Sequence, residues 1–242
     1  MIAIRPIITI EEMHACEQLQ KAVWQFRDVE AVPASVLMVA SKTGGEVLGA
    51  FDNDRPIGFS LAFLSLREDR TCLHSHMAAV LPEHQNRGVG RRLKLGQRNH
   101  ALARGIDLIE WTFDPLQLRN AHFNVARLGA AVRRYLPDLY GRTTSDLDTG
   151  LPTDRLLAEW WLDSDRVCAA IEGSGGQMRS THERISIPVE IGEIRKTVPR
   201  EAERIQSQVR LRFQELFGNS YAVTGFELDS NFGSYLLEKI EP

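Results

Sequence analysis

The sequence predicts an α/β fold of the α+β kind, in which a mixed, mostly antiparallel sheet is flanked by helices. Segments with strand-like and helix-like patterns follow one another in the order β-α-α-β-β-β-α-β-α-β-β, which is typical of a sheet covered by helices. The composition agrees with this class. With 43% hydrophobic and 25% charged residues, a chain of 242 residues has the ordinary globular mixture and can bury a sizeable core.

The N-terminal part of the chain predicts one strand and two helices. Residues 3–8 are strand-like, and Thr9 and Glu12 have the spacing of a capping box, so a helix is expected to begin there. A second helix is expected over residues 34–42. It ends before Gly44, because glycine takes the left-handed conformation that helix C-termini often need.

Strands dominate the middle of the chain. Strand-like patterns cover residues 47–51, 57–66, 72–80, 108–114, 131–135 and 155–162, with helical patterns over 88–104 and 120–128. The strand at 108–114 alternates cleanly, and its apolar face carries Ile109, Trp111 and Phe113. Its other face, which includes Glu110, is unusually polar for the middle of a fold.

A glycine-containing loop is the most informative motif in the sequence. It reads QNRGVG over residues 85–90 and lies where a strand turns into the first turn of a helix. That first turn leaves N–H groups unpaired and carries partial positive charge, and glycine lets a phosphate approach the backbone closely. The loop therefore predicts an anion site, to which Arg87, Arg91 and Arg92 would add charge.

Two other phosphate motifs do not fit this loop. A P-loop needs a Lys-Ser or Lys-Thr pair after its glycines, and the dinucleotide fingerprint needs a third glycine where this chain has Leu93. The loop instead resembles the Q/R-x-x-G-x-G/A signature of the GNAT superfamily of N-acyltransferases. The turn at residues 127–130, which reads RLGA, is similar to the R/K-x-G-F-like turn that closes a later helix in that family. The order of elements up to about Leu162 also matches.

The resemblance implies that the chain binds acetyl-CoA or another acyl-CoA as co-substrate, without a metal. In the family the loop amides bind the pyrophosphate, the preceding strand lines the pantetheine arm, and a distorted part of that strand polarises the thioester carbonyl. The residues implied to bind the cofactor are Met77, Ala78, Ala79, Val80, Gln85, Asn86, Arg87, Gly88, Val89, Gly90, Arg91, Asn120 and Asn124. Asn120 and Asn124 could equally be a cap or surface residues.

Transfer to an amine needs a proton acceptor. Glu110 is the first candidate, since a partly buried carboxylate beside the glycine-loop strand could have a raised pKa. A salt-bridged or solvated Glu110 is an equally good interpretation. His76 is the second candidate, directly or through water, whereas His74 on the same face fits a polar pair within a sheet better. Asp114 fits an Asp-Pro turn.

The expected general acid is missing. Many family members carry a thiolate-protonating tyrosine four positions before the closing glycine, and this chain has Val125 there. Tyr135 and Tyr140 follow, but a structural role at strand ends is the better interpretation of both. A second function class is therefore kept open: a non-catalytic acyl-CoA-binding module with a sensory or regulatory role. A general nucleotide-binding protein is a third.

The acceptor is predicted by elimination. No acidic run suits a basic peptide and no basic run suits nucleic acid, so a small-molecule amine such as an amino acid is favoured. Ala78 and Ala79 are small where the acyl group is expected, and a donor larger than acetyl, such as succinyl, stays open. A homodimer is possible but not required.

The C-terminal part predicts an extension of the transferase domain. Residues 1–163 are expected to form that domain, residues 164–183 a flexible connection, and residues 184–242 an extension packed on the same domain. In the extension we expect a strand at 184–191, a helix at 199–217 and a hairpin of strands 221–226 and 234–240. Such an extension either adds to the sheet or covers its cleft.

Composition narrows the location. The net charge is -3, and neither an apolar run long enough for a membrane span nor a signal-peptide pattern is evident. The three cysteines, Cys16, Cys72 and Cys168, suggest neither a disulfide framework nor a metal site. We therefore expect a cytoplasmic, reduced protein with no membrane partner.

Overall fold

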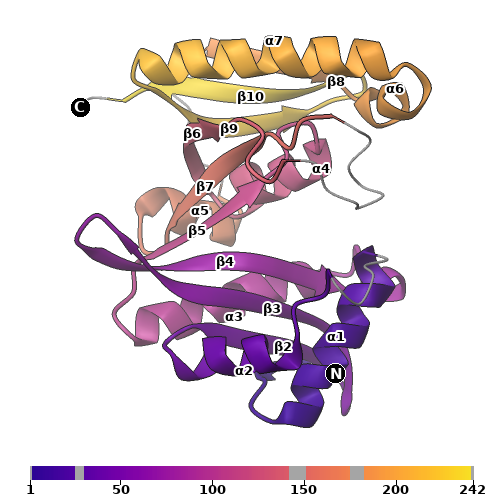
Figure 1. Ribbon diagram of the computed structural model, residues 1–242. Coiled ribbons are helices and arrows are strands. Elements are labelled where there is room, and N and C mark those ends of the chain that lie inside the picture. The colour runs from indigo at the N-terminus through magenta and orange to yellow at the C-terminus, as the bar shows by residue number, and fades with distance from the viewer. Residues whose placement is uncertain (1, 25–29, 142–150, 175–182, 241–242) are drawn as a thin grey trace. The chain divides into compact units, whose positions relative to one another are not determined.

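The computed structural model describes residues 2–24, 30–141, 151–174 and 183–240, and these form two compact units (Figure 1). The first unit contains the described residues up to Glu110, and the second contains the described residues from Trp111 onward. The boundary therefore falls within a strand, a division that the sequence analysis did not anticipate.

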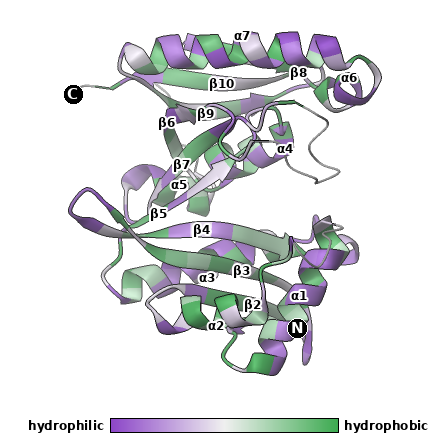
Figure 2. Ribbon diagram, in the orientation of Figure 1, coloured by the Kyte–Doolittle hydropathy of each residue, from purple (hydrophilic) through white to green (hydrophobic). Residues whose placement is uncertain are grey.

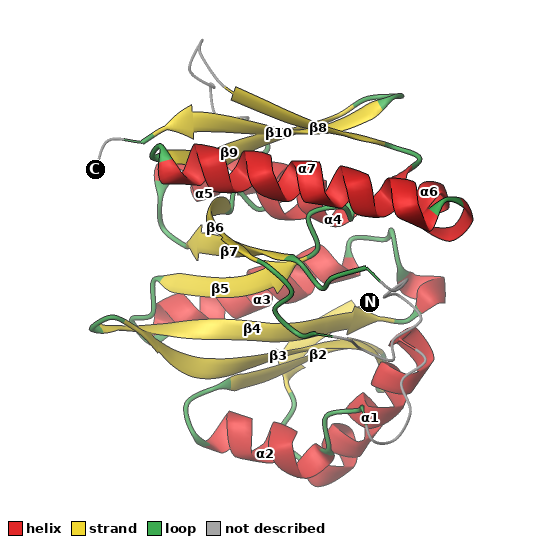
Figure 3. Ribbon diagram, turned by 45° about the horizontal axis from the view of Figure 1, so that its top comes forward, coloured by secondary structure: helices red, strands yellow, loops and turns green. Residues whose placement is uncertain are grey.

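The first unit is a sheet covered on both faces. Its elements are β1 (Ile2–Pro6), α1 (Ile10–Trp24), α2 (Ala34–Lys42), β2 (Glu46–Asp52), β3 (Arg55–Arg67), β4 (Arg70–Val80), the short 3-10 helix η1 (Pro82–His84), α3 (Val89–Ala103) and the start of β5 (Leu108–Phe113). Strands β1 to β4 pair antiparallel in chain order, and β5 pairs parallel with β4. Helices α1 and α2 lie on one face and α3 on the other (Figures 1 and 3).

The start of α1 follows the predicted capping pattern. Thr9 Oγ1 accepts a hydrogen bond from the Glu12 N–H at 3.3 Å, and the Glu12 carboxylate accepts from the Ile8 N–H at 3.2 Å. The carboxylate thus reaches one residue further back than an ideal capping box requires. Helix α2 has the predicted bounds, and Gly44 after it has a φ of +89°. Local signals therefore fix both helices.

The second unit is also a sheet with helices on both faces. From the end of β5 it contains α4 (Leu118–Ala121), η2 (His122–Arg127), β6 (Ala131–Leu136), β7 (Arg155–Trp161), α5 (Asp165–Glu172), β8 (Glu183–Pro188), α6 (Ile191–Thr197), α7 (Pro199–Gly218), β9 (Tyr221–Leu228) and β10 (Phe232–Lys239). The strand order is β5-β7-β6-β9-β10-β8. Helix α7 covers one face of β8, β9 and β10, and η2 with α5 lies on the other (Figure 1).

The helix predicted at residues 120–128 differs in kind from the one observed. It begins earlier, at Leu118, and from His122 it widens into the π-helix η2. The Leu128 N–H donates to the Phe123 carbonyl, five residues back, at 3.0 Å. Gly129 then takes a φ of +76°, and the helix ends there. A periodicity of 3.6 residues cannot signal such a widened turn.

The C-terminal predictions need two corrections. The segment 164–183 was predicted to be a flexible connection, but helix α5 occupies its first part, capped by Ser164, whose Oγ accepts from the Val167 N–H. Residues 175–182 lie outside the described residues. The strand predicted at 184–191 ends at Pro188, and Ile191 instead begins α6, a helix that the sequence analysis missed.

The C-terminal extension adds to the sheet, as one of the two predicted alternatives. Strands β9 and β10 form the predicted hairpin, and Val223 of β9 pairs with Val132 of β6. Helix α7 is amphipathic, with hydrophobic and hydrophilic residues alternating along it (Figure 2). Its buried Phe213 packs against the rings of Tyr135 and Tyr235, with centroids 5.7 and 5.1 Å away. The extension is therefore part of the core of the second unit.

Across the described ranges, no helix combines the length and the apolar character needed to cross a membrane.

Candidate active site

Strand β4 carries a bulge in its middle. Met77 pairs with Leu61 on β3, and Ser75 pairs with the next residue along, Ala62. His76 therefore lies between two paired residues without a partner of its own in that ladder. A bulge interrupts the ladder and re-aims the local backbone. It lies at the edge of the segment where the sequence analysis expects amides to polarise a thioester, although that role stays a prediction.

Two histidines lie beside the bulge. The ring centroids of His74 and His76 are 6.4 Å apart, and the His76 ring is 5.6 Å from that of Phe63. Desolvation lowers the pKa of both imidazoles below the ordinary 6.5, and the charges of His76 and Lys94 lower that of His74 further. Both rings are therefore neutral near pH 7 and able to accept a proton. Of the two, His76 is the exposed one.

Glu110, the first predicted proton acceptor, lies opposite His74 in the parallel register of β4 and β5. It is only 7% exposed, so the expected burial is present. Its Oε1 accepts a hydrogen bond from Arg67 Nη1 at 2.6 Å. This ion pair is the alternative interpretation that the sequence left open. Because Glu110 would have to loosen that contact to take a proton, the geometry favours His76 as the acceptor.

The loop after β4 is built by two residues with positive φ. Asn86 has a φ of +59° and Gly88, which caps α3, has a φ of +77°. The side chain of Gln85 turns back and donates from Nε2 to the Val80 carbonyl at 2.9 Å. Gln85 therefore holds the loop against the end of β4, a structural role that the motif alone did not reveal.

The two motif glycines face open space. A Cβ built at Gly88 or at Gly90 would meet no described atom within 4 Å. At Gly88 the positive φ explains the glycine. Gly90 has no such explanation, and glycine within a helix costs about 1 kcal/mol relative to alanine. Open backbone beside the unpaired N–H groups of a first helical turn is the arrangement that admits an anion.

The arginines near the loop differ in their surroundings. Arg87 is exposed and Arg91 is half-buried. Arg92 was expected to add charge to the same corner, but its guanidinium donates to the Ile2 carbonyl of β1. Arg92 thus ties α3 to the edge of the sheet, whereas Arg87 lies in the loop itself, next to Gly88.

The last residues of β4 do not contribute alike. Met77 and Val80 are half-buried and Ala78 is exposed. Ala79 is 1% exposed and packs into the core of the first unit. Of the two alanines expected to leave room for an acyl group, only Ala78 presents its methyl group outside the core.

A buried polar cluster behind β4 was missed by the sequence analysis. Lys94 of α3 is 6% exposed and donates from Nζ to Ser75 Oγ at 2.8 Å, and Ser75 Oγ lies 3.2 Å from Gln97 Oε1. Burial lowers the pKa of Lys94 to about 7 and raises that of the buried Glu46 to about 7. The only available signal was a lysine on the apolar side of a predicted helix.

The remaining predicted site residues lie in the second unit. Asn120 is exposed, whereas Asn124 is 2% exposed, and its Nδ2 finds no hydrogen-bond acceptor among the described residues. Val125, at the position of the family tyrosine, is buried. The sites in the first unit and these residues are thus carried by different compact units.

Neither predicted substitute for the tyrosine is a free acid. The Tyr135 hydroxyl donates to Asp154 Oδ2 at 2.6 Å, and burial with this carboxylate holds its pKa far above the usual value. The Tyr140 hydroxyl lies 2.9 Å from Thr112 Oγ1. Asp114 accepts from the Leu116 N–H at 2.8 Å, as expected of a turn residue.

The mixed sheet, in which the bulged strand β4 continues through the glycine loop into α3, is the arrangement that the resemblance to the acyltransferase family implies. The comparison with family models agrees: residues 10–130, half of the chain, match the model described as the acetyltransferase (GNAT) family. The chain therefore belongs to this family, and the expectation drawn from the loop motif is confirmed.

Solved structures share the fold. A GNAT-family protein from Desulfovibrio desulfuricans superposes with a TM-score of 0.54 at 16% identity, over 67% of this chain and 99% of that chain. The ribosomal-protein-S18-alanine N-acetyltransferase from Escherichia coli superposes with a TM-score of 0.52 at 16% identity, over 68% of this chain and 96% of that chain. The structure of yncA from Salmonella typhimurium, solved with acetyl-CoA, superposes with a TM-score of 0.51 at 18% identity, over 67% of this chain and 95% of that chain. No curated protein matches the sequence.

Proposed function

We propose that this protein is an acyl-CoA-dependent N-acyltransferase that moves an acetyl group, or a larger acyl group such as succinyl, to the amine of a small molecule. The observation that carries the proposal is the open glycine backbone at Gly88 and Gly90, at the start of α3. The loop amides would hold the pyrophosphate of the donor. The acetyl-CoA bound by the fold relative yncA supports the same class of donor.

In the proposed reaction both substrates are bound together. The amine nitrogen attacks the thioester carbon, a C–N bond forms and the C–S bond breaks. His76 takes the proton that the amine loses, because its imidazole is exposed and stays neutral at neutral pH. Backbone amides beside the bulge would stabilise the negative charge that develops on the thioester oxygen.

The leaving thiolate does not require a tyrosine in this scheme. A thiol has an ordinary pKa of about 8.5, so a thiolate leaves readily and can take its proton from water. Acyl transfer is therefore compatible with Val125 at the usual tyrosine position. The same valine favours the second candidate function, a non-catalytic acyl-CoA sensor, which would bind the donor without turnover.

The first experiment is a calorimetric titration of the full chain with acetyl-CoA, succinyl-CoA, CoA and ATP. A thiol-release screen against amino acids and simple amines follows. We expect an acyl-CoA to bind more tightly than ATP and free thiol to appear with at least one amine. Binding without release for any amine would support the sensor, and equal affinity for ATP would point to a general nucleotide-binding protein.

A pair of glycine variants tests the loop itself. Gly88 and Gly105 lie at opposite ends of α3, have φ values of +77° and +71°, and both face open space. Alanine at either position carries the same left-handed strain, about 1–2 kcal/mol. We expect Gly88→Ala to weaken acyl-CoA binding at least about tenfold, or 1.4 kcal/mol, and Gly105→Ala to leave it unchanged. Equal effects on binding would remove the loop from the proposed site.

A further inference from the structure

A buried polar contact joins helix α3 to strand β4 beside the bulge. Lys94 Nζ donates to Ser75 Oγ at 2.8 Å, and Ser75 Oγ donates to Gln97 Oε1 at 3.2 Å. Each of these three side chains is at most 6% exposed. Lys94 follows Gly90 by about one helical turn, so the helix that begins at the glycine loop also holds the strand.

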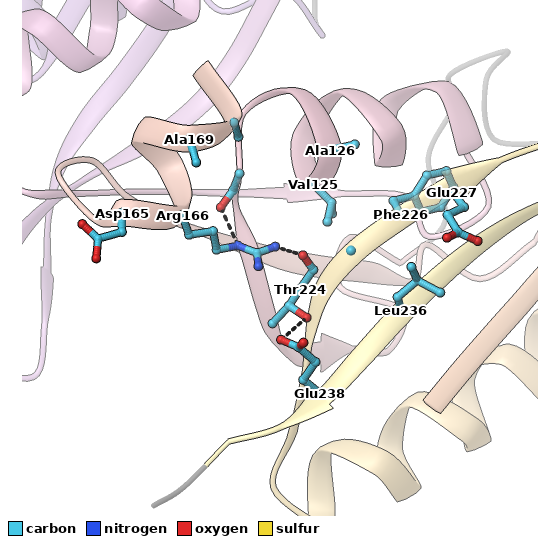
Figure 4. A pocket seen from close by; sticks show the side chains of 13 residues that line it. Val125, Ala126, Asp165, Arg166, Ala169, Thr224, Phe226, Glu227, Leu236 and Glu238 are labelled. Carbon is cyan, nitrogen blue, oxygen red and sulfur yellow. Dashed lines mark hydrogen bonds between the residues drawn. The ribbon is translucent and has the colours of Figure 1, made fainter. Parts of the chain in front are cut away.

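The pocket shown in Figure 4 does not involve this contact. It has a volume of about 460 Å³, lies between η2, α5 and the hairpin of β9 and β10, and is lined by residues of the second unit alone. Lys94, Ser75 and Gln97 belong to the first unit and are nearly closed to solvent. Their contact is therefore a link between α3 and β4 and not part of this pocket.

The ladder between β3 and β4 does not fix His76. Ser75 pairs with Ala62 and Met77 pairs with Leu61, so His76 between them is left out of the pairing. In a regular strand the ladder sets the direction of each side chain, whereas a bulge interrupts the ladder and bends the strand. Ser75 is buried against α3, and the next residue, His76, is exposed. A hold on the Ser75 side chain therefore also fixes the backbone from which the His76 imidazole projects.

A second buried serine shows that a hydroxyl in this sheet need not be bonded. Ser60 of β3 has no exposed surface, and its Oγ has no hydrogen-bond partner among the described residues. It lies in a regular part of the ladder, opposite Ala78. The serine beside the bulge is instead bonded by two side chains of α3, one of them a lysine whose burial is costly. Costs of this kind are commonly retained at functional sites.

We propose that Ser75, held by Lys94 and Gln97, is a positioning residue that fixes the bulge of β4 and thereby aims the imidazole of His76. The inference rests on the proposed function, in which His76 takes the proton of the amine. Burial lowers the pKa of Lys94 to about 7. Both the charged and the neutral amine of a lysine carry N–H donors, so the contact with Ser75 persists when Lys94 titrates.

Amide hydrogen exchange tests the hold on the bulge without any substrate. Ser75→Ala removes both side-chain contacts, and Lys94→Met removes one of them while filling the same space. We expect exchange over residues 75–77 to be at least about tenfold faster in Ser75→Ala than in the natural protein, with a smaller increase in Lys94→Met. Ser60→Ala, the matched control, removes no hydrogen bond to a described residue and should leave this exchange unchanged. Exchange that is unchanged in Ser75→Ala, or that rises equally over residues 47–51 of β2, would overturn the proposal.

A double-mutant cycle tests the link to His76. Ser75→Ala should lower kcat about tenfold and leave the Kd for acyl-CoA unchanged, and it should cause no further loss in the His76→Gln background. Ser75→Thr, which keeps the hydroxyl, should retain most of the turnover. An equal loss of kcat in both backgrounds would show a general structural role and overturn the proposal. Absence of turnover in the natural protein would refute the proposed function alone, because the exchange measurement does not depend on turnover.

Discussion

The two units differ in the hydrogen bonds that their buried carboxylates accept. In the second unit, Asp154 has no exposed surface and accepts four hydrogen bonds, from the Tyr135 hydroxyl, the Asp138 N–H and two nitrogens of Arg210. In the first unit, Glu46 is 5% exposed, and its carboxylate accepts no hydrogen bond from the described residues. His100 Nδ1 lies 3.2 Å from it without hydrogen-bond geometry.

This difference in hydrogen bonding distinguishes a buried carboxylate that stabilises the fold, Asp154, from one that lowers its stability, Glu46. Fully satisfied buried groups rigidify a fold, and Asp154, just before β7, is bound both by Tyr135 of β6 and by Arg210 of helix α7. Partly satisfied groups lower stability, and Glu46 lies in the unit that carries the candidate active site. Sites of chemistry commonly retain such costs, while scaffold regions do not.

The largest expected effect concerns Asp154, the buried carboxylate that accepts four hydrogen bonds. Arg210→Leu leaves Asp154 buried without its guanidinium, and we expect a loss of about 3 kcal/mol in the free energy of unfolding. Arg212→Leu on the same helix removes two exposed ion pairs and should cost less than about 1 kcal/mol. Urea denaturation of both variants gives the comparison. Similar losses would mean that Asp154 does not stabilise the packing of α7 on β6 and β7.

The second prediction concerns the proposed proton acceptor. His76→Gln should lower turnover about 100-fold or more, and Glu110→Gln should lower it less, because Arg67 already engages that carboxylate. Since the pKa of His76 lies below 6.5, activity of the natural protein should hold at pH 7 and fall only in more acidic solution. A pH–rate profile of kcat/KM tests this. If the fall of kcat/KM in acidic solution disappears in Glu110→Gln and not in His76→Gln, Glu110 is the proton acceptor instead.

The third prediction concerns Lys94. Its pKa is 10.5 when unfolded and about 7 when folded, so between these values the unfolded chain binds more protons and stability rises with pH. We expect thermal stability to increase from pH 7 to 9, and this increase to be absent in Lys94→Met. Lys42→Met, at an exposed position, should keep it. An unchanged slope in Lys94→Met would show that the buried lysine is not the cause.

The smallest expected effect is a gain in stability at Gly90 of α3 that is accompanied by weaker acyl-CoA binding. Gly90→Ala should stabilise the protein by up to about 1 kcal/mol while weakening acyl-CoA binding, because a methyl group would occupy the open backbone. Gly192→Ala in α6, also without a neighbour within 4 Å, should bring only the stability gain. Melting curves with and without acetyl-CoA measure both. Tighter binding by Gly90→Ala would contradict the site.

Local signals made much of this molecule predictable. The cap at Thr9, the bounds of α2 and the turn at Gly88 each depend on a few consecutive residues, whose conformational preferences do not need the rest of the chain. The family followed from the same loop. Helix α5 also had a local signal in Ser164, but the glycines after it drew the interpretation toward a connection.

Contacts between distant residues were not predictable in this way. Arg67 and Glu110 are 43 positions apart, and Arg210 and Asp154 are 56 apart. No single-sequence pattern pairs such residues. The ion pair at Glu110 is therefore visible only in the structure, and it changed the favoured proton acceptor.

The C-terminal strands also decide how the second unit can meet other molecules. β6 has neighbours on both sides, β7 and β9, so another chain cannot extend the sheet there. Within the described residues the exposed edge is β8, a short strand that carries Glu183 and Arg184 and ends at Pro188. Charges and proline at an edge discourage pairing between chains. The extension thus covers β6 and leaves at the edge a strand whose charges and proline disfavour pairing with another chain. A homodimer of this protein could not form by strand pairing at β6.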